Sequence, residues 1–266
     1  MNSDQTLCPP NLQPDLEPGR AFISRNSPPG RVLLCAVTGS HFYGFPAPDS
    51  DLDLKGIHLA PTRSLLGLSR PDPAVNAEGL ESGILCDYTS NEAEQALRLL
   101  LKGNGNMLER IFSPIQLYKT EEHKALIELA PSYLSRRVLH HYKGFFQQVC
   151  EQHLKDGDRR IKPLLYAYRT ALTGVHLLLT KELVGDLRRL APLYGFDAAL
   201  ELIEIYQSSS EKKTLDPAED ARHQAFWPTL LERLEMADCT SPLPDDPPAE
   251  QRCSDWLVGL RLGTLA

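Results

Sequence analysis

The sequence lacks the patterns that define several common classes of protein. Its six cysteines form no C-x-x-C pair and its eight histidines form no H-E-x-x-H pattern, which excludes a zinc knuckle and a zincin-type site. No apolar run approaches the roughly 18 residues needed to cross a bilayer, and the first twenty residues do not resemble a secretory signal. With cysteines inside apolar runs, these absences predict a cytoplasmic protein with reduced thiols and no membrane partner.

An overall excess of positive charge is also missing. The formal net charge of the 266 residues is -7, which argues against a protein that simply coats nucleic acid. The charge is uneven, however: between Arg98 and Arg169, thirteen Lys and Arg stand against seven Asp and Glu, a net charge of +6, so the rest of the chain carries -13. This basic middle segment could face phosphates, although a solvated helix face is the simpler interpretation of most of its side chains taken singly.

The predicted elements change in type along the chain. Apolar or alternating runs predict strands at 31–38, 51–59 and 83–88, while the Pro- and Gly-containing stretch 61–81 predicts a loop. Apolar residues at helical spacing then predict helices over 91–112 with an interruption at 103–106, and over 121–129, 132–155, 162–183, 197–207, 216–238 and 254–262. Strands followed by helices are typical of an α+β part joined to an all-helical part.

Four regions follow from this order. We expect a proline-rich, disordered arm over 1–30, an α+β core with a small mixed sheet and flanking helices over 31–118, and a helical domain over 119–240 that closes a cleft. Residues 241–266 are expected to form a proline-rich linker and a C-terminal helix that docks through Trp256 and Leu260.

Three aspartates form the candidate catalytic group. Asp51 and Asp53 should point to the same side of their strand, because side chains alternate faces. Two neighbouring carboxylates repel each other unless a cation lies between them, and oxygen ligands suit Mg²⁺ or Mn²⁺. Asp87 on the third strand would complete a two-metal site; Glu78 or Glu81 takes its place if the strand register differs.

Other residues are candidates for nucleotide binding. Gly39 allows the backbone to approach phosphate closely, and Ser40 adds a hydroxyl. Tyr43 either packs on the nucleotide-facing loop or is structural. Lys162 and Arg169 lie at helical spacing on one face, which either contacts phosphates or belongs to a partly buried helix with extended side chains.

The chain has an apolar strand that ends in Gly-Ser, then about ten residues, and then Asp-x-Asp. This order resembles the motif of the polymerase-beta nucleotidyltransferase superfamily. More narrowly, TGSHFYGFPAPDSDLDLKGIHLAP is similar to the RNA-ligase-associated polymerase-beta-like proteins. The matching positions are Gly39, Ser40, Tyr43, Gly44, Ser50, Asp51, Asp53 and Gly56. LLLKGNGNMLE at 99–109 resembles that family's leucine-rich helix and Gly-Asn-Pro-Asn turn, with Gly105 where proline is common. HYKGFFQQ at 141–148 and KPLLYAYRTALTG at 162–174 resemble its helical second half, so the likeness covers about residues 31–180.

The resemblance implies an enzyme with a nucleotidyltransferase fold that moves an NMP from an NTP to an acceptor hydroxyl, with Mg²⁺ or Mn²⁺ and pyrophosphate release. It also implies a connection to RNA repair, with an RNA end as acceptor and an RNA ligase or other repair protein as partner. Two alternatives stay open: transfer to a protein or small molecule, and a nucleotide-binding module without catalysis.

Overall fold

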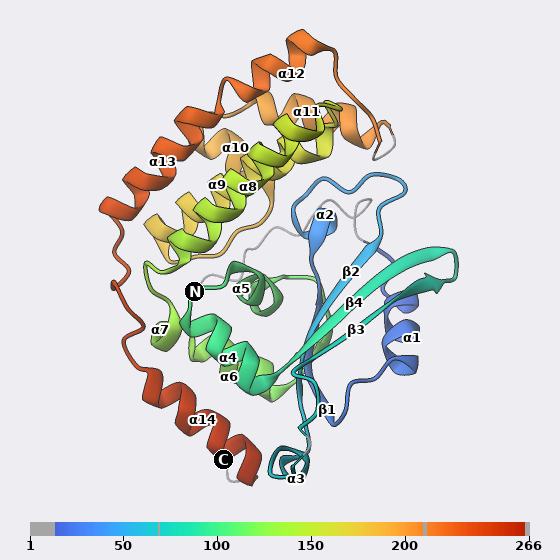
Figure 1. Ribbon diagram of the computed structural model, residues 1–266, viewed down its shortest axis with the longest axis vertical. Helices are drawn as coiled ribbons and strands as arrows, with labels where there is room; N and C mark the ends of the chain where they lie inside the picture. The colour runs from blue at the N-terminus through green and yellow to red at the C-terminus, as the bar shows by residue number, and fades with distance from the viewer. Residues whose placement is uncertain (1–13, 69, 210–211, 264–266) are drawn as a thin grey trace. The chain divides into compact units, whose positions relative to one another are not determined.

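A mixed five-stranded sheet organises the first half of the chain (Figure 1). The computed structural model describes residues 14–68, 70–209 and 212–263. The strand order is β3-β4-β2-β1-β5, with β2 parallel to β4 and the other neighbours antiparallel. The strands are β1 Arg31–Val37, β2 Leu52–Leu59, β3 Ala74–Glu81, β4 Ile84–Glu92 and β5 Gln116–Lys119. The predicted α+β class with a mixed sheet and a later helical region is confirmed.

The chain divides into two compact units whose boundaries differ from the expected ones. Among the described residues, the sheet unit comprises those within 14–41, 51–134 and 247–263, and the helical unit comprises those within 42–50 and 135–246. The change from sheet unit to helical unit therefore falls after residue 134 instead of 118. In addition, the segment that connects Gly-Ser to Asp-x-Asp belongs to the helical unit.

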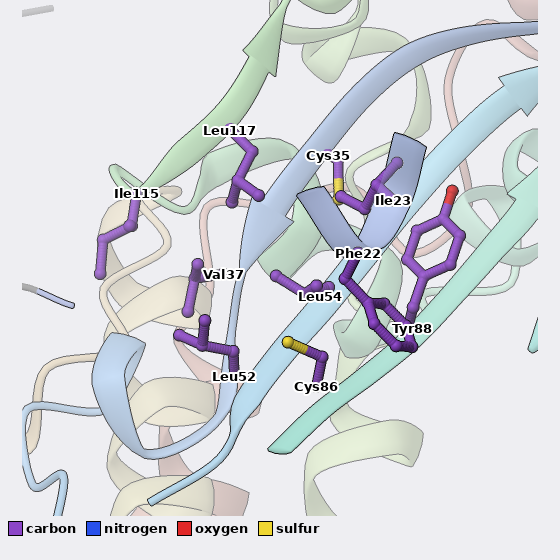
Figure 2. Packing of buried hydrophobic residues seen from close by; sticks show 10 residues of the cluster. All are labelled: Phe22, Ile23, Cys35, Val37, Leu52, Leu54, Cys86, Tyr88, Ile115 and Leu117. Carbon is purple, nitrogen blue, oxygen red and sulfur yellow. The ribbon is translucent and has the colours of Figure 1, made fainter. Parts of the chain in front are cut away.

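One face of the sheet packs against α1 (Glu17–Arg25). Phe22 and Ile23 of this helix join an apolar cluster whose other members come from the strands and from the residue before β5: Cys35, Val37, Leu52, Leu54, Cys86, Tyr88, Ile115 and Leu117 (Figure 2). The expectation of a disordered arm over 1–30 is therefore wrong for residues 17–25, because two large apolar side chains bury this segment. Residues 1–13 lie outside the described part of the chain.

The opposite face of the sheet carries α4 (Ala93–Leu101) and α5 (Gly105–Phe112) (Figure 1). The Glu92 side chain caps α4 by accepting a hydrogen bond from the Glu94 backbone N–H, and the Asn104 side chain caps α5 by accepting one from Met107. The predicted interruption at 103–106 is thus the junction between two separately capped helices.

The C-terminal helix belongs to the sheet unit. After α6 (Glu121–Glu128) and α7 (Ala130–Tyr133), the chain returns to this unit only with α14 (Glu250–Leu262), which contacts α4 and α7. Trp256 and Leu260 are both buried, as the sequence predicts. Arg261 adds an ion pair with Glu92, with Nη2 2.9 Å from Oε1 and 3.0 Å from Oε2.

The helical unit is built around α8 (Val138–Asp156) and α9 (Ile161–Thr180), which pack along each other. Helix α9 also contacts α10, α11 and α13, and through Tyr168 it contacts His223 of α12. Gly174 permits close approach: a Cβ there would lie 2.8 Å from both Leu234 and Tyr142. The remaining helices of this unit are α10 Leu187–Tyr194, α11 Ala198–Gln207, α12 Pro217–Gln224 and α13 Trp227–Cys239. Two further short helices lie earlier in the chain, α2 Gly39–Phe42 and α3 Thr62–Leu65.

Some sequence expectations are wrong. Residues 74–81, expected to be loop, form the edge strand β3, whose small Ala77 and Gly79 mask the strand pattern; Gly79 leaves room for the Phe22 ring. The helix expected over 216–238 is divided at 225–226 into α12 and α13, because Pro228 has no N–H to donate to the carbonyl of Gln224, four residues earlier. Strand β5 and helix α10 were not expected.

Candidate active site

Asp51 and Asp53 lie where β2 begins. Leu52 and Leu54 are buried in the core on the α1 side, whereas Asp51 and Asp53 are only partly buried. Strand alternation therefore turns the Asp53 carboxylate to the opposite side of the sheet. Asp51 directly precedes the first residue of β2.

Asp87 lies next to Asp53 in the sheet. The two residues are direct partners in the parallel β2–β4 ladder, so their side chains lie on the same face. Glu78 faces Asp87 from the edge strand β3, one strand further from Asp53. Glu81 forms an ion pair with Arg25 of α1. Of the three carboxylates considered as the third member, Asp87 is the one adjacent to Asp53.

A lysine that the motif comparison did not single out lies among these carboxylates. Lys55 follows Asp53 by two residues and therefore shares its face of β2. Its Nζ is 2.6 Å from Asp87 Oδ2 and 3.6 Å from Asp53 Oδ1, and it also contacts the Asp87 carbonyl oxygen at 3.3 Å. The period of two along the strand is the signal that could have identified it.

Gly39 lies directly against Asp53. Its φ of +64° favours glycine, and a Cβ at this position would lie 1.7 Å from Asp53 Oδ2. The backbone around the pair is joined as well, since the Thr38 N–H donates to the Asp53 carbonyl at 2.9 Å. The Gly-Ser turn and the Asp-x-Asp strand are therefore one local structure, in which glycine is needed for close approach.

Ser40 has a buried hydroxyl. The residue is 3% exposed, and within the described residues its Oγ makes no hydrogen bond. Burying a hydroxyl without a partner is unfavourable. A ligand oxygen beside the turn would supply the missing partner.

Arg110 of α5 connects this helix to the strands that carry the aspartates. It donates to the Gly56 carbonyl at 3.0 Å and to the Asn91 side chain, linking β2, β4 and α5. Burial lowers the pKa of Arg110 to about 10, so the guanidinium remains a cation at neutral pH. The sequence alone does not indicate this role, since an arginine in an amphipathic helix is usually exposed.

Tyr43 and Arg169 contact each other within the helical unit. The Arg169 guanidinium carbon lies 3.8 Å from the centre of the Tyr43 ring, a cation–π arrangement, and Arg169 is 1% exposed. The following Gly44 fits against Asp186, whose carboxylate oxygen would be 2.1 Å from a Cβ. The Tyr-Gly part of the motif therefore anchors its loop to the helices.

Lys162 begins α9, about two turns before Arg169. It lines a pocket of about 380 Å³ in the helical unit together with Phe145 and Pro163. Tyr166, Arg160 and Asp156 lie in the same lining, so aromatic, basic and acidic side chains share this pocket, and Arg160 pairs with Asp156 at 3.5 Å. Lys162 is thus partly exposed beside a cavity, whereas Arg169 is an interior residue.

The oxygen-only donors Asp51, Asp53 and Asp87 suit a hard divalent cation such as Mg²⁺. Their arrangement fits a metal less well than their chemistry does. Across the described ranges, no group of three His, Cys, Asp or Glu side chains gathers closely enough to hold a metal ion. At Asp53 and Asp87, the Lys55 ammonium occupies a position between the carboxylates.

Among the described residues, no helix is long and apolar enough to cross a membrane.

Comparison with known proteins gives matches over most of the chain. Residues 21–259 match the family described as "RNA repair pathway DNA polymerase beta family". The uncharacterized protein MJ0002 of Methanocaldococcus jannaschii is 27% identical over 222 residues, which are 81% of this chain and 88% of the relative. The uncharacterized protein YcgL of Bacillus subtilis is 22% identical over 219 residues, 77% of this chain and 80% of the relative.

Two solved structures are similar at lower identity. Spectinomycin adenyltransferase AAD(9) from Enterococcus faecialis gives a TM-score of 0.49 at 11% identity, covering 83% of this chain and 98% of its own. A nucleotidyltransferase-like protein from Exiguobacterium sibiricum gives 0.33 at 10% identity, covering 84% and 74%. At these scores, neither likeness bears on the substrate of this chain.

Proposed function

The chain belongs to the RNA repair pathway DNA polymerase beta family and is therefore a nucleotidyltransferase; we propose that it moves an NMP from an NTP to an acceptor hydroxyl. The observation that carries this proposal is the contact of Gly39 with Asp53, beside which Asp87 lies in register. It joins the turn and the carboxylates that nucleotidyl transfer requires.

Each candidate site residue of the sheet unit has a role in this proposal. Asp51 and Asp53 would hold Mg²⁺ or Mn²⁺, with Asp87 as the third ligand. Such an ion, when bound, orients the triphosphate and lowers the pKa of the attacking hydroxyl. The Gly39 and Ser40 turn binds phosphate oxygens through backbone N–H groups and the buried hydroxyl.

The reaction is a displacement at the α-phosphorus. The acceptor oxygen forms a bond to this phosphorus while the bond to the β-phosphate bridging oxygen breaks, and pyrophosphate leaves. The acceptor proton passes to Asp87, which lies on the same face as Asp53. Tyr43 and Arg169, which contact each other, are the proposed nucleotide-binding residues of the helical unit.

An RNA end is the acceptor that we propose. The family description names an RNA repair pathway. The pocket beside Lys162 combines aromatic and basic side chains, as sites for single-stranded nucleic acid do. An RNA ligase or another repair protein would act on the same RNA and is the proposed partner.

Transfer of label from α-³²P-NTPs tests the proposal. The wild-type chain is incubated with each NTP, Mg²⁺ and separate pools of RNA, proteins and small molecules, and the labelled product is identified. We expect labelled RNA and released pyrophosphate with wild type, and none with Asp51→Asn or Asp53→Asn. Asp72→Asn, which alters an exposed aspartate of the sheet unit, should transfer like wild type.

Each other outcome has a defined meaning. Label in protein or small molecules would replace the proposed acceptor while keeping the chemistry. Binding of Mg-NTP without label in any pool would identify a nucleotide-binding module without catalysis. Full activity of Asp53→Asn would refute the assignment of the site.

A further inference from the structure

The third carboxylate of the candidate site is already paired with a cation from the protein itself. Lys55 Nζ lies 2.6 Å from Asp87 Oδ2, and Asp53 Oδ1 is 3.6 Å from the same nitrogen. The register explains this arrangement: Asp53 and Asp87 are direct partners, and Lys55 projects from the same face two residues further along β2. The ammonium therefore lies where two neighbouring strands bring their carboxylates together.

These three side chains are only partly exposed. The exposed fractions of the side chains are 17% for Lys55, 23% for Asp53 and 44% for Asp87. In such surroundings, neighbouring carboxylates are costly without a positive charge, and the charge of Lys55 offsets their repulsion. A divalent ion on the same oxygens would be repelled by the ammonium at close range, so the two cations compete for Asp87.

We propose that Lys55 is a resident counter-ion of the acidic site and that a divalent metal ion reaches Asp87 only when the Lys55 ammonium leaves that carboxylate. This inference rests on the proposed function, because it concerns the same metal ligands. Lys55 is thus a positioning residue, which acts through Asp87.

The proposal makes an unusual prediction: removal of a lysine strengthens metal binding. Mn²⁺ is titrated into the full chain without nucleotide, and free Mn²⁺ is measured by electron paramagnetic resonance. Lys55→Met removes the charge and keeps much of the length of the side chain, and we expect roughly tenfold tighter Mn²⁺ binding, a change of about 1.4 kcal/mol. Lys102→Met, which removes an exposed lysine of the sheet unit, should leave the affinity near that of wild type.

A double variant assigns the effect to Asp87. In the Asp87→Asn background, Lys55→Met should tighten Mn²⁺ binding much less, since the carboxylate that Lys55 releases is no longer present. Lys55→Arg keeps the charge and should retain affinity close to wild type. Lys55→Gln is measured in parallel and should also bind Mn²⁺ more tightly, so the test does not depend on one variant folding. Thermal melting identifies the folded variants.

The outcomes separate this inference from the proposed function. If wild type binds Mn²⁺ and transfers label, but folded Lys55→Met or Lys55→Gln binds Mn²⁺ no more tightly, the counter-ion role is refuted and the function stands. An equal gain with and without Asp87 also refutes it. If no variant binds Mn²⁺ and wild type transfers no label, the proposed function and this inference are refuted together.

Discussion

The backbone of Gly39 lies against the carboxylate of Asp53, so closely that a Cβ on residue 39 would be 1.7 Å from Oδ2. The Gly-Ser part of the motif therefore needs its glycine because of the Asp-x-Asp part, independently of any ligand. Glycine at this position satisfies two conditions at once, a φ of +64° and the absence of a side chain.

Gly39→Ala should abolish transfer with only a moderate loss of stability. The added methyl group must displace the Asp53 carboxylate, whereas the positive φ alone costs about 1 kcal/mol. Gly157→Ala is the matched control, because Gly157 has a φ of +62° and nothing within 4 Å of the added Cβ. Turnover and urea unfolding are measured for both. Equal turnover in the two variants would show that contact with Asp53 does not matter.

The metal-ligand candidates and the order of elements could be predicted because they depend on local patterns. Alternation predicts that Asp51 and Asp53 share one face. In the structure Asp53 lies in β2 between the buried Leu52 and Leu54, and Asp51 directly precedes the strand. The neighbour of Asp53 could not be derived in the same way, since strand pairing is a long-range property. The ladder between β2 and β4 places Asp87 beside it, with Glu78 one strand further out.

The parts that could not be predicted depend on tertiary contacts. Helix α1 lies in a proline-rich sequence, and only its packing on the sheet through Phe22 and Ile23 distinguishes it from an arm. Likewise, the spacing of Lys162 and Arg169 predicts that they share one face of the helix, but it does not predict how deeply each side chain is buried. Arg169 is buried under Tyr43 while Lys162 stays beside a pocket, which depends on what packs over each turn of α9.

The C-terminal helix should depend on one ion pair for much of its attachment. Arg261 donates to both oxygens of Glu92, whose side chain also caps α4. Arg261→Met leaves a buried carboxylate without its cation, and we expect a loss of about 2–4 kcal/mol in the free energy of unfolding. Hydrogen exchange should show faster opening of α14. Arg252→Met, on an exposed position of the same helix, should change neither.

Unfolding should become easier as the pH falls below neutrality. Burial lowers the pKa of His58 and His123 in the sheet unit from an ordinary value of 6.5, and that of His176 and His223 in the helical unit. The unfolded chain therefore takes up these protons first, and the free energy of unfolding decreases below about pH 6.5. Urea titrations between pH 8 and pH 5.5 measure the slope.

His58→Gln should make that slope shallower by up to about 1.4 kcal/mol per pH unit, the contribution of one group. The residue is fully buried, and its Nδ1 lies 2.9 Å from Ser90 Oγ, so the variant will also be less stable at pH 8. The change in slope, and not the loss at pH 8, is the relevant quantity. An unchanged slope would mean that His58 takes no part in acid unfolding.

Lys162 and Arg169 should respond differently to the loss of their charge. Arg169 is an interior cation in contact with Tyr43, so Arg169→Met should lower the melting temperature and disturb the loop. Lys162 is partly exposed beside the pocket with Phe145 and Tyr166, and Lys162→Met should leave the melting temperature near that of wild type. Lys155→Met is the control for an exposed lysine of the same unit.

The effect of Lys162→Met on the affinities for Mg-NTP and for RNA identifies the ligand that Lys162 contacts. Loss of a charge-assisted hydrogen bond to phosphate costs about 1.5–3 kcal/mol, roughly ten- to a hundredfold in binding. If the nucleotide is the partner, Lys162→Met weakens Mg-NTP binding by that factor. If RNA is the partner, Mg-NTP affinity is kept, RNA binding weakens, and the slope of log K against log salt decreases by about 0.7, as for one contact to a single strand. Because the pocket combines a lysine with aromatic side chains, we expect the second result. Binding of both ligands at the level of Lys155→Met would show that Lys162 contacts neither of them.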